Sequence, residues 1–190
     1  MSDGLPTEDA GLVRAREAAL RFLAYRPRSE AEVRRRLLDR FPELLVERVV
    51  QRLKAQHLLD DASFASQWRR NREQHRPRAK GLVRQELRRL GVPTEVADQA
   101  LEGFDDASNA YRAGQRLARR LAGAHDQESD FRRRLGEHLR RRGFGYALAA
   151  QTAARLWREL ADPLHRNEDA SGDEQQAPDT ELEVEEKPTD

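Results

Sequence analysis

A repeat of about fifty residues is the feature that most constrains the fold of this 190-residue chain. The tripeptide Arg-Pro-Arg at 26–28 reappears fifty positions later, at 76–78. At the same offset, two apolar residues of the first copy have apolar counterparts in the second: Val33 with Val83, and Leu37 with Leu87. Such a period is typical of repeat proteins in which each copy is one small supersecondary unit. We therefore expect an array of units rather than one large core.

A third copy follows with less regular spacing. Phe131 and Leu135 match Val83 and Leu87 at an offset of 48, whereas the segment LRRRGF at 139–144 matches LRRLGV at 87–92 at an offset of 52. Four additional residues make about one helical turn. The sequence thus predicts one extra turn in the middle helix of the third unit.

Within each unit, apolar residues recur at the three- and four-residue spacing of amphipathic helices. Ser29 and Glu32 have the spacing of a capping box at the start of a helix, and the helix before it is expected to end ahead of Pro27. No segment shows sustained alternation of β-branched residues, so no strand is expected. The prediction is an all-α fold of three tandem three-helix repeats that stack into an elongated, curved array.

The expected organisation is a flexible N-terminus at 1–10, repeats at 11–59, 60–103 and 104–161, and a disordered acidic tail at 162–190. The tail has eleven acidic and two basic residues, a formal net charge of −9, and too little apolar surface to offset its ordering entropy. The remainder has 33 basic and 23 acidic residues, a net charge of +10. A basic body of this kind indicates a polyanionic or acidic partner.

The residues offer no convergent set for catalysis or metal binding. The chain has no cysteine, and no two of its five histidines lie three or four positions apart. Asp60-Asp61 precedes a predicted helix and fits an N-cap better than a pair of catalytic carboxylates. We expect a non-enzymatic protein without cofactor or metal. It has no apolar run of eighteen residues and no signal-like start, so we expect no membrane association and a cytoplasmic location.

Arginine makes up 32 of the 35 basic side chains. Codon bias in a GC-rich genome could explain this abundance, and arginine stems often cover apolar neighbours on solvated helices. Arginine also forms bidentate contacts with phosphate and carboxylate. Because the clusters fall at equivalent places in the units, we favour a basic stripe along the array. Its candidate residues are Arg34, Arg35, Arg69, Arg70, Arg72, Arg76, Arg84, Arg88, Arg132, Arg133, Arg140 and Arg141.

Four segments carry a family resemblance: AALRFLAYRPRSEAE at 18–32, LLDDASFA at 58–65, VRQELRRLGV at 83–92 and LRRRGF at 139–144. In this order, over about residues 12–160, they resemble the RecX family of bacterial regulatory proteins. The chain departs from the family's pattern at His57, where a glycine is usual, and at Phe41-Pro42, where Gly-Phe or Gly-Tyr is common. It also lacks the common Gly-rich turn at 74–78, and its acidic tail has no counterpart in the family.

The resemblance implies a function. RecX-like proteins lie along the groove of the RecA–DNA filament, bridge neighbouring protomers, and inhibit ATP hydrolysis, strand exchange and co-protease activity. They thereby modulate recombination, DNA repair and the SOS response. The implied partner is the RecA filament, with DNA contacts that are not sequence-specific, and we expect a monomer. On this hypothesis the binding surface includes Arg69, Arg72, Arg76, Arg132 and Arg140.

Two alternatives remain open at this point. One is a helix-turn-helix-like DNA-binding regulator, although the middle helices are rich in Arg, Leu and Glu and poor in the Asn, Gln, Ser and Thr that read base edges. The other is a scaffold that binds RecA without touching nucleic acid. The tail is either a solubilising extension or a segment that folds back over the basic stripe and weakens DNA binding.

Overall fold

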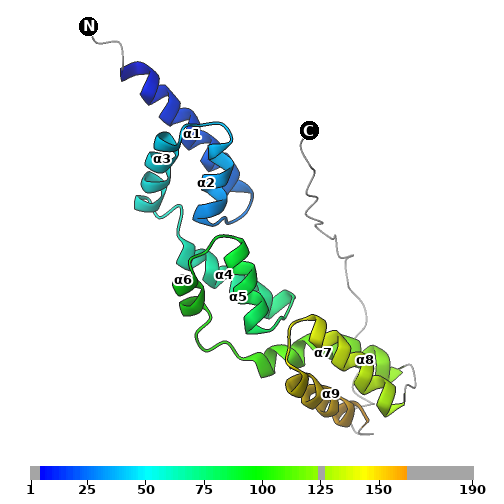
Figure 1. Cartoon of the computed structure of the whole chain (residues 1–190). Helices are drawn as coiled ribbons and strands as arrows, with labels where there is room; N and C mark the ends of the chain where they lie inside the picture. The colour runs from blue at the N-terminus through cyan, green and yellow to red at the C-terminus, as the bar shows by residue number, and fades with distance from the viewer. Residues whose placement is uncertain (1–4, 124–126, 162–190) are drawn as a thin grey trace.

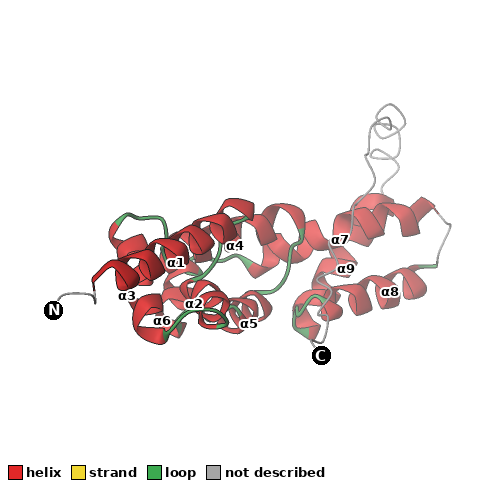
Figure 2. Ribbon diagram, turned by 90° about the horizontal axis from the view of Figure 1, so that it is seen from above, coloured by secondary structure: helices red, strands yellow, loops and turns green. Residues whose placement is uncertain are grey.

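The computed structural model of the chain describes residues 5–123 and 127–161. These described residues form nine α-helices and no strand, grouped three by three into successive units (Figure 1). The units follow one another in an elongated row, and only helices and loops are seen when the row is viewed from above (Figure 2). The all-α repeat fold predicted from the sequence is confirmed. The predicted acidic tail at 162–190 lies outside the described residues.

The helices have the following bounds. Unit 1 contains α1 (Leu5–Tyr25), α2 (Glu30–Leu38) and α3 (Glu43–Ala55). Unit 2 contains α4 (Asp61–His75), α5 (Lys80–Arg89) and α6 (Thr94–Ala100). Unit 3 contains α7 (Asp106–Gly123), α8 (Glu128–Arg141) and α9 (Tyr146–Ala161). The middle helix α8 has 14 residues against 10 in α5, so the extra turn predicted from the repeat offsets is confirmed.

The first helix extends further towards the N-terminus than expected. Helix α1 begins at Leu5, so residues 5–10 are helical where the sequence predicted a flexible end. Pro6 is compatible with this start, because a proline in the first turn lacks only an N–H that has no intrahelical partner. Residues 1–4 lie outside the described part of the chain.

Each unit encloses its own hydrophobic core. The apolar residues matched by the repeat are at most 1% exposed: Val33, Leu37, Val83, Leu87, Phe131 and Leu135. The buried residues form three separate clusters, one for each unit, and Ala79 of unit 2 joins the cluster of unit 3. The units therefore share little apolar core, because the three helices of a unit already bury one another's apolar faces.

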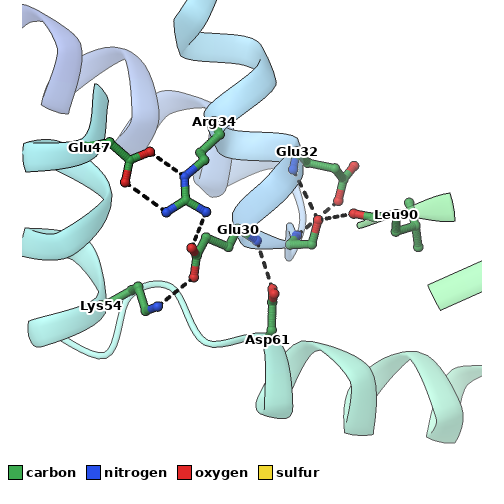
Figure 3. Close-up of polar contacts among 8 residues, drawn as sticks. Glu30, Glu32, Arg34, Glu47, Lys54, Asp61 and Leu90 are labelled. Atoms are coloured by element: carbon green, nitrogen blue, oxygen red, sulfur yellow. Dashed lines mark hydrogen bonds and ion pairs between the residues drawn. The ribbon is translucent and has the colours of Figure 1, made fainter. Parts of the chain in front are cut away.

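Units 1 and 2 meet through the ends of their middle helices, at a contact that we call joint 1–2. The backbone N–H of Glu30, at the start of α2, donates to Asp61 Oδ1 at 2.8 Å (Figure 3). The hydroxyl of Ser29 donates to the carbonyl of Leu90, at the end of α5. Ser29 also forms the predicted capping box with Glu32, since its hydroxyl accepts from the Glu32 N–H. One buried serine thus caps α2 and ties it to the next unit.

Units 2 and 3 repeat this arrangement at joint 2–3. The N–H of Lys80, at the start of α5, donates to Asp106 Oδ1 at 2.7 Å. The N–H of Ala79 donates to the carbonyl of Arg142, at the end of α8, at 3.0 Å. At both joints an aspartate that begins one unit binds the middle helix of the unit before it. The middle helices therefore follow one another end to end along the row.

The two residues of the pair Asp60-Asp61 have different roles, one within unit 2 and one between units. The pair was predicted to supply an N-cap, and Asp60 is the N-cap of α4, where it accepts from the N–H of Ala62 at 2.9 Å and the hydroxyl of Ser63 at 2.7 Å. Asp61 instead holds Glu30 of the preceding unit. The second task was not foreseen, because the N–H that it satisfies lies 31 residues earlier in the chain.

Glycines at the ends of α5 and α8 permit the close approach of the units. Gly91 has φ +82° and Gly143 has φ +88°, a region that favours glycine. A Cβ on Gly91 would lie 2.2 Å from Cβ of Ala31, and one on Gly143 would lie 3.1 Å from Cβ of Leu82. The following Phe144 turns into the core of unit 3 and is 3% exposed.

Candidate partner-binding interface

The twelve arginines predicted as a basic stripe divide into two groups of six in the structure. One group is held by carboxylates of the same unit: Arg34, Arg69, Arg72, Arg84, Arg132 and Arg133. The other group is exposed and forms no side-chain hydrogen bond or ion pair within the described residues: Arg35, Arg70, Arg76, Arg88, Arg140 and Arg141. The second group has its guanidinium donors available for a partner.

Arg34 illustrates the first group (Figure 3). Its guanidinium makes a bidentate contact with Glu47 at 2.6 and 3.0 Å and a further ion pair with Glu30, which also binds Lys54 Nζ at 2.8 Å. The hydrogen bond to Glu47 raises the pKa of Arg34 above its usual value. Burial would raise the pKa of Glu30, but its contacts with Lys54 and Arg34 lower it overall. This network joins α2 to α3 inside unit 1.

Arg69 and Arg72 hold unit 2 together in a similar way. Arg69 donates to the carbonyls of Ala100 at 3.0 Å and Glu102 at 2.6 Å, where α6 ends. Arg72 lies over the ring of Trp68 at 4.3 Å and donates to Glu86 at 2.7 Å. These guanidiniums satisfy orphan carbonyls and link α4 to its neighbours. Their first role is therefore intramolecular.

The exposed group is concentrated in the last turn of each middle helix. Arg35 lies in the last turn of α2, Arg88 in that of α5, and Arg140 and Arg141 in that of α8. Arg36 and Arg89 lie in the same turns, are exposed and also lack a partner within the described residues, although they were not among the predicted set. We call these six the last-turn arginines. The helix macrodipole favours a cation at this position by about 0.3–1 kcal/mol, so each can remain without an internal carboxylate.

Unit 3 also carries a groove between α8 and α9, with a volume of about 470 Å³. Three predicted residues, Arg132, Arg133 and Arg140, line it together with Ala149, Ala150 and Ala153. Tyr146, 77% exposed, stands at its edge. The ion pairs of Arg132 with Glu128, and of Arg133 with Asp130 and Glu137, join exposed side chains. Exposed pairs contribute about 0–1 kcal/mol, so an acidic partner can replace the internal carboxylates.

The described residues contain no group of three or more His, Cys, Asp or Glu side chains that could hold a metal ion. The half-buried ring of His138 lies with Nε2 3.2 Å from the carbonyl of Ala113, and burial, followed by the charge of Arg142, lowers its pKa. A neutral imidazole that donates from Nε2 fits this contact between α8 and α7. None of the described helices has both the length and the apolar character needed to cross a membrane.

Comparison with known proteins assigns units 1 and 2 to the same family. Residues 15–53 match the model of the first three-helix domain of RecX, and residues 60–101 match the model of the second. The regulatory protein RecX of Chlorobium limicola is 35% identical over 140 residues, which cover 73% of this chain and 87% of that protein. The regulatory protein RecX of Mycolicibacterium smegmatis is 37% identical over 141 residues, covering 71% and 75%.

A solved structure has the same fold. The crystal structure of RecX from Lactobacillus salivarius superposes with a TM-score of 0.67 at 22% identity, covering 78% of this chain and 97% of that one. The sequence relatives match over most of their own length, and the matched domain models follow the same order along the chain as units 1 and 2. The chain therefore belongs to the RecX family of regulatory proteins.

Proposed function

We propose that this protein binds the RecA filament on DNA and inhibits its recombinase, ATPase and co-protease activities. Through this inhibition it modulates recombination, DNA repair and the SOS response. Membership of a family of regulatory proteins named RecX supports the regulatory role. The elongated row of similar units supports the choice of a filament as partner, because a filament offers the same surface at regular intervals (Figure 1).

One observation carries the proposal most directly. Each unit has two of the last-turn arginines, in the last turn of α2, α5 or α8. Since the middle helices follow one another end to end, the array presents free guanidiniums at successive points along its length. Guanidiniums bind carboxylates on proteins and phosphates on nucleic acid in the same bidentate manner. This arrangement suits a surface built from RecA protomers and the DNA that they wind around.

The groove of unit 3 supplies a second contact on this proposal. The arginines that line it suit acidic side chains, and its alanines and the exposed Tyr146 suit a small apolar side chain. The exposed ion pairs of Arg132 and Arg133 would open when a carboxylate of the filament enters. The protein acts by occupying the filament, not by a chemical step.

A matched pair of triple variants tests the proposal. The first reverses one last-turn arginine in each unit: Arg35→Glu, Arg88→Glu and Arg140→Glu. The second makes the same change of net charge at exposed, unpartnered arginines of the flanking helices: Arg14→Glu, Arg48→Glu and Arg116→Glu. We expect the first variant to need at least about tenfold more protein to inhibit RecA ATP hydrolysis on single-stranded DNA, which corresponds to about 1.4 kcal/mol. The second should stay within about threefold of the natural protein, because general charge effects are screened at moderate salt.

The comparison of the two variants separates local contacts from net charge. Equal losses in both would mean that the array is attracted only by its overall positive charge, and the assignment of the last-turn arginines would be wrong. Full inhibition by the first variant would remove the observation on which the proposal rests. Circular dichroism and thermal unfolding should be unchanged in both, since none of the six side chains has an intramolecular partner within the described residues.

A further inference from the structure

The two joints have the same backbone arrangement but different charges. In unit 1, the repeated Arg-Pro-Arg segment precedes α2, and both its arginines bind one carboxylate. Arg26 lies 2.7 Å and Arg28 lies 3.3 Å from Glu32 Oε1. Glu32 belongs to the first turn of α2, where it also completes the capping box. The positive charge beside joint 1–2 is therefore countered within the unit.

Unit 2 lacks the residue that counters this charge. At the repeat offset of fifty, Glu32 corresponds to Leu82. Arg78 instead pairs with Glu86, one turn further along α5, which also binds Arg72 at 2.7 Å. Arg76 is exposed and has no hydrogen bond or ion pair to any described residue. Arg76 of the second copy is thus free, whereas its counterpart in the first copy, Arg26, is paired with Glu32.

Joint 2–3 adds another cation at the same place. Arg142 follows α8 where joint 1–2 has the apolar Leu90, and its Nη1 lies 3.3 Å from the carbonyl of Pro77, between Arg76 and Arg78 in sequence. The side chain is half-buried, and no carboxylate among the described residues lies within ion-pair distance of it. Burial lowers its pKa, and the facing charges of Arg78 and Arg76 lower it further.

The remaining charged groups around the joint do not balance this cluster. Glu86 is already shared by Arg78 and Arg72, and Asp106 accepts from the N–H of Lys80. The half-buried ring of His138 on α8 feels the positive charges of Arg142, Arg141 and, from α7, Arg120. The N-terminus of α5 also faces the joint, and Ala79 gives it no side-chain cap where α2 has Ser29. The carboxylate of Asp106 binds the Lys80 N–H and offsets part of the positive potential of this helix end.

We propose that joint 2–3 binds a phosphate of a nucleic-acid backbone, with Arg76 and Arg142 as its direct ligands and Arg78 as a supporting cation. The site rests on the proposed function, in which the protein lies against the DNA of the filament, and it names the place of that contact. A phosphodiester offers oxygens to several guanidiniums at once, which suits a cluster of this size. At joint 1–2, by contrast, the carboxylate of Glu32 pairs with both Arg26 and Arg28.

The pairing of the joints also sets the position of the site along the array. Joint 1–2 has an equivalent backbone, but both arginines of its Arg-Pro-Arg segment are paired with Glu32, and Leu90 occupies the place of Arg142. The strand is therefore held between units 2 and 3 rather than equally at both joints. Units 1 and 3 remain free to contact protein on either side of this point.

The test uses the full chain and a fluorescently labelled oligothymidine single strand. Fluorescence anisotropy gives the dissociation constant at salt concentrations from about 50 to about 200 mM. The variants are Arg76→Ala, Arg142→Leu and, as a matched control at the equivalent position of unit 1, Arg26→Ala. We expect Arg76→Ala and Arg142→Leu each to raise the dissociation constant about threefold to tenfold. Each should also reduce the slope of its logarithm against the logarithm of salt concentration by about 0.7, the value for one lost phosphate contact.

Arg26→Ala removes the same charge from the other joint and should leave the slope unchanged. Arg76 has no intramolecular partner within the described residues, so its replacement tests the site even if Arg142→Leu disturbs folding. Equal slopes for Arg76→Ala and the natural protein, or equal losses in Arg76→Ala and Arg26→Ala, would overturn the site. Failure of the natural protein to bind the strand would also overturn it.

A parallel titration of each variant into RecA on single-stranded DNA distinguishes the site from the proposed function. Inhibition by the natural protein, with DNA binding unaffected by Arg76→Ala, would leave the function standing and the site wrong. Loss of inhibition in Arg76→Ala without loss of DNA binding would identify an acidic protein surface as the occupant, which also contradicts a phosphate site. DNA binding that depends on Arg76, in a protein that does not inhibit RecA, would support the site and refute the function.

Discussion

Residues in the left-handed backbone region fix the ends of several helices in this array. Gly91 and Gly143 follow α5 and α8, while His57 follows α3 with φ +54°. This conformation costs a side chain other than glycine about 1–2 kcal/mol, although histidine adopts it more readily than branched residues do. The glycine that is usual at the place of His57 in RecX-like sequences therefore has a conformational reason. Histidine at this position therefore costs stability relative to glycine.

Replacing His57 with glycine should stabilise unit 1. The substitution removes the left-handed penalty of about 1–2 kcal/mol, but glycine also loses about 0.5–1 kcal/mol more backbone entropy on folding. The net expectation is an increase of about 0.5–1 kcal/mol in the free energy of unfolding, measured by urea titration. A decrease would show that the exposed imidazole makes a stabilising contribution that outweighs its backbone conformation.

Gly91 is required for a second reason, the contact with Ala31 across joint 1–2. Gly103 provides a matched control, because it also has positive φ (+65°) but a Cβ there would meet nothing within 4 Å. We expect Gly103→Ala to cost about 1 kcal/mol in stability, whereas Gly91→Ala should cost more and should also separate the units. Hydrogen exchange at the Glu30 amide should accelerate only in Gly91→Ala. Equal exchange in the two variants would mean that joint 1–2 does not depend on this close approach.

The partners of individual arginines could not be predicted from the sequence. Arg34 binds Glu47 and Arg72 binds Glu86, pairs separated by 13 and 14 residues on different helices. Such pairs depend on how the helices pack, whereas repeat spacing shows only that two arginines are equivalent. Equivalent arginines can even differ in state: Arg26 is paired and Arg76 is free, because the residue six positions after each is glutamate in one case and leucine in the other.

At the scale of elements, the helices and their buried faces followed from the sequence because helical periodicity is a local property. The repeat offsets placed Leu37, Leu87 and Leu135 at equivalent core positions, and all three are buried. The joints between units could not be predicted from the sequence, because their hydrogen bonds link residues that are far apart along the chain. Ser29 and Leu90 are 61 positions apart, and Arg142 and Pro77 are 65 apart. No local pattern marks which helix end will meet which.

Asp61 should hold joint 1–2 through its oxygen rather than its charge. Burial raises the pKa of Asp61, so its ionised form costs stability at neutral pH, and this cost disappears as the pH falls through the raised pKa. Asp61→Asn keeps an acceptor for the Glu30 N–H and removes the charge, whereas Asp61→Ala leaves that N–H without its partner. At neutral pH, we expect the Glu30 amide to exchange about tenfold faster in Asp61→Ala. In Asp61→Asn the Glu30 amide should exchange no faster than in the natural protein. Faster exchange in Asp61→Asn would mean that the negative charge of Asp61 is needed to stabilise joint 1–2.

The packing of α8 on α7 should weaken in mild acid because of His138. Its pKa is lowered in the folded protein, so the unfolded chain binds a proton more readily and stability falls as the pH drops below about 6.5. Urea unfolding at pH 7.5 and pH 5.5, about one unit on either side of the unfolded value, measures this loss. His138→Gln retains a donor for the Ala113 carbonyl and cannot titrate, so its loss between the two pH values should be smaller. An identical loss in both proteins would contradict the assignment to His138.

At the scale of the whole molecule, the array combines three separate cores with narrow, polar joints. This construction lets each unit fold around its own apolar cluster while hydrogen bonds at helix ends set the order and spacing of the units. The last-turn arginines lie at these helix ends and have no ion pair within the described residues. A regulator built in this way can follow a repetitive filament, with arginines presented at intervals and the most basic contact at joint 2–3.

The rate of ATP hydrolysis by RecA on single-stranded DNA tests this account most directly. Adding the protein to preformed filaments at moderate salt should lower the rate progressively to a plateau, since the array occupies the filament at a limited number of sites. Reversal of Arg35, Arg88 and Arg140 to glutamate should shift the curve to at least about tenfold higher concentration. An ATPase rate that stays unchanged at a saturating excess of the natural protein would contradict the proposed function.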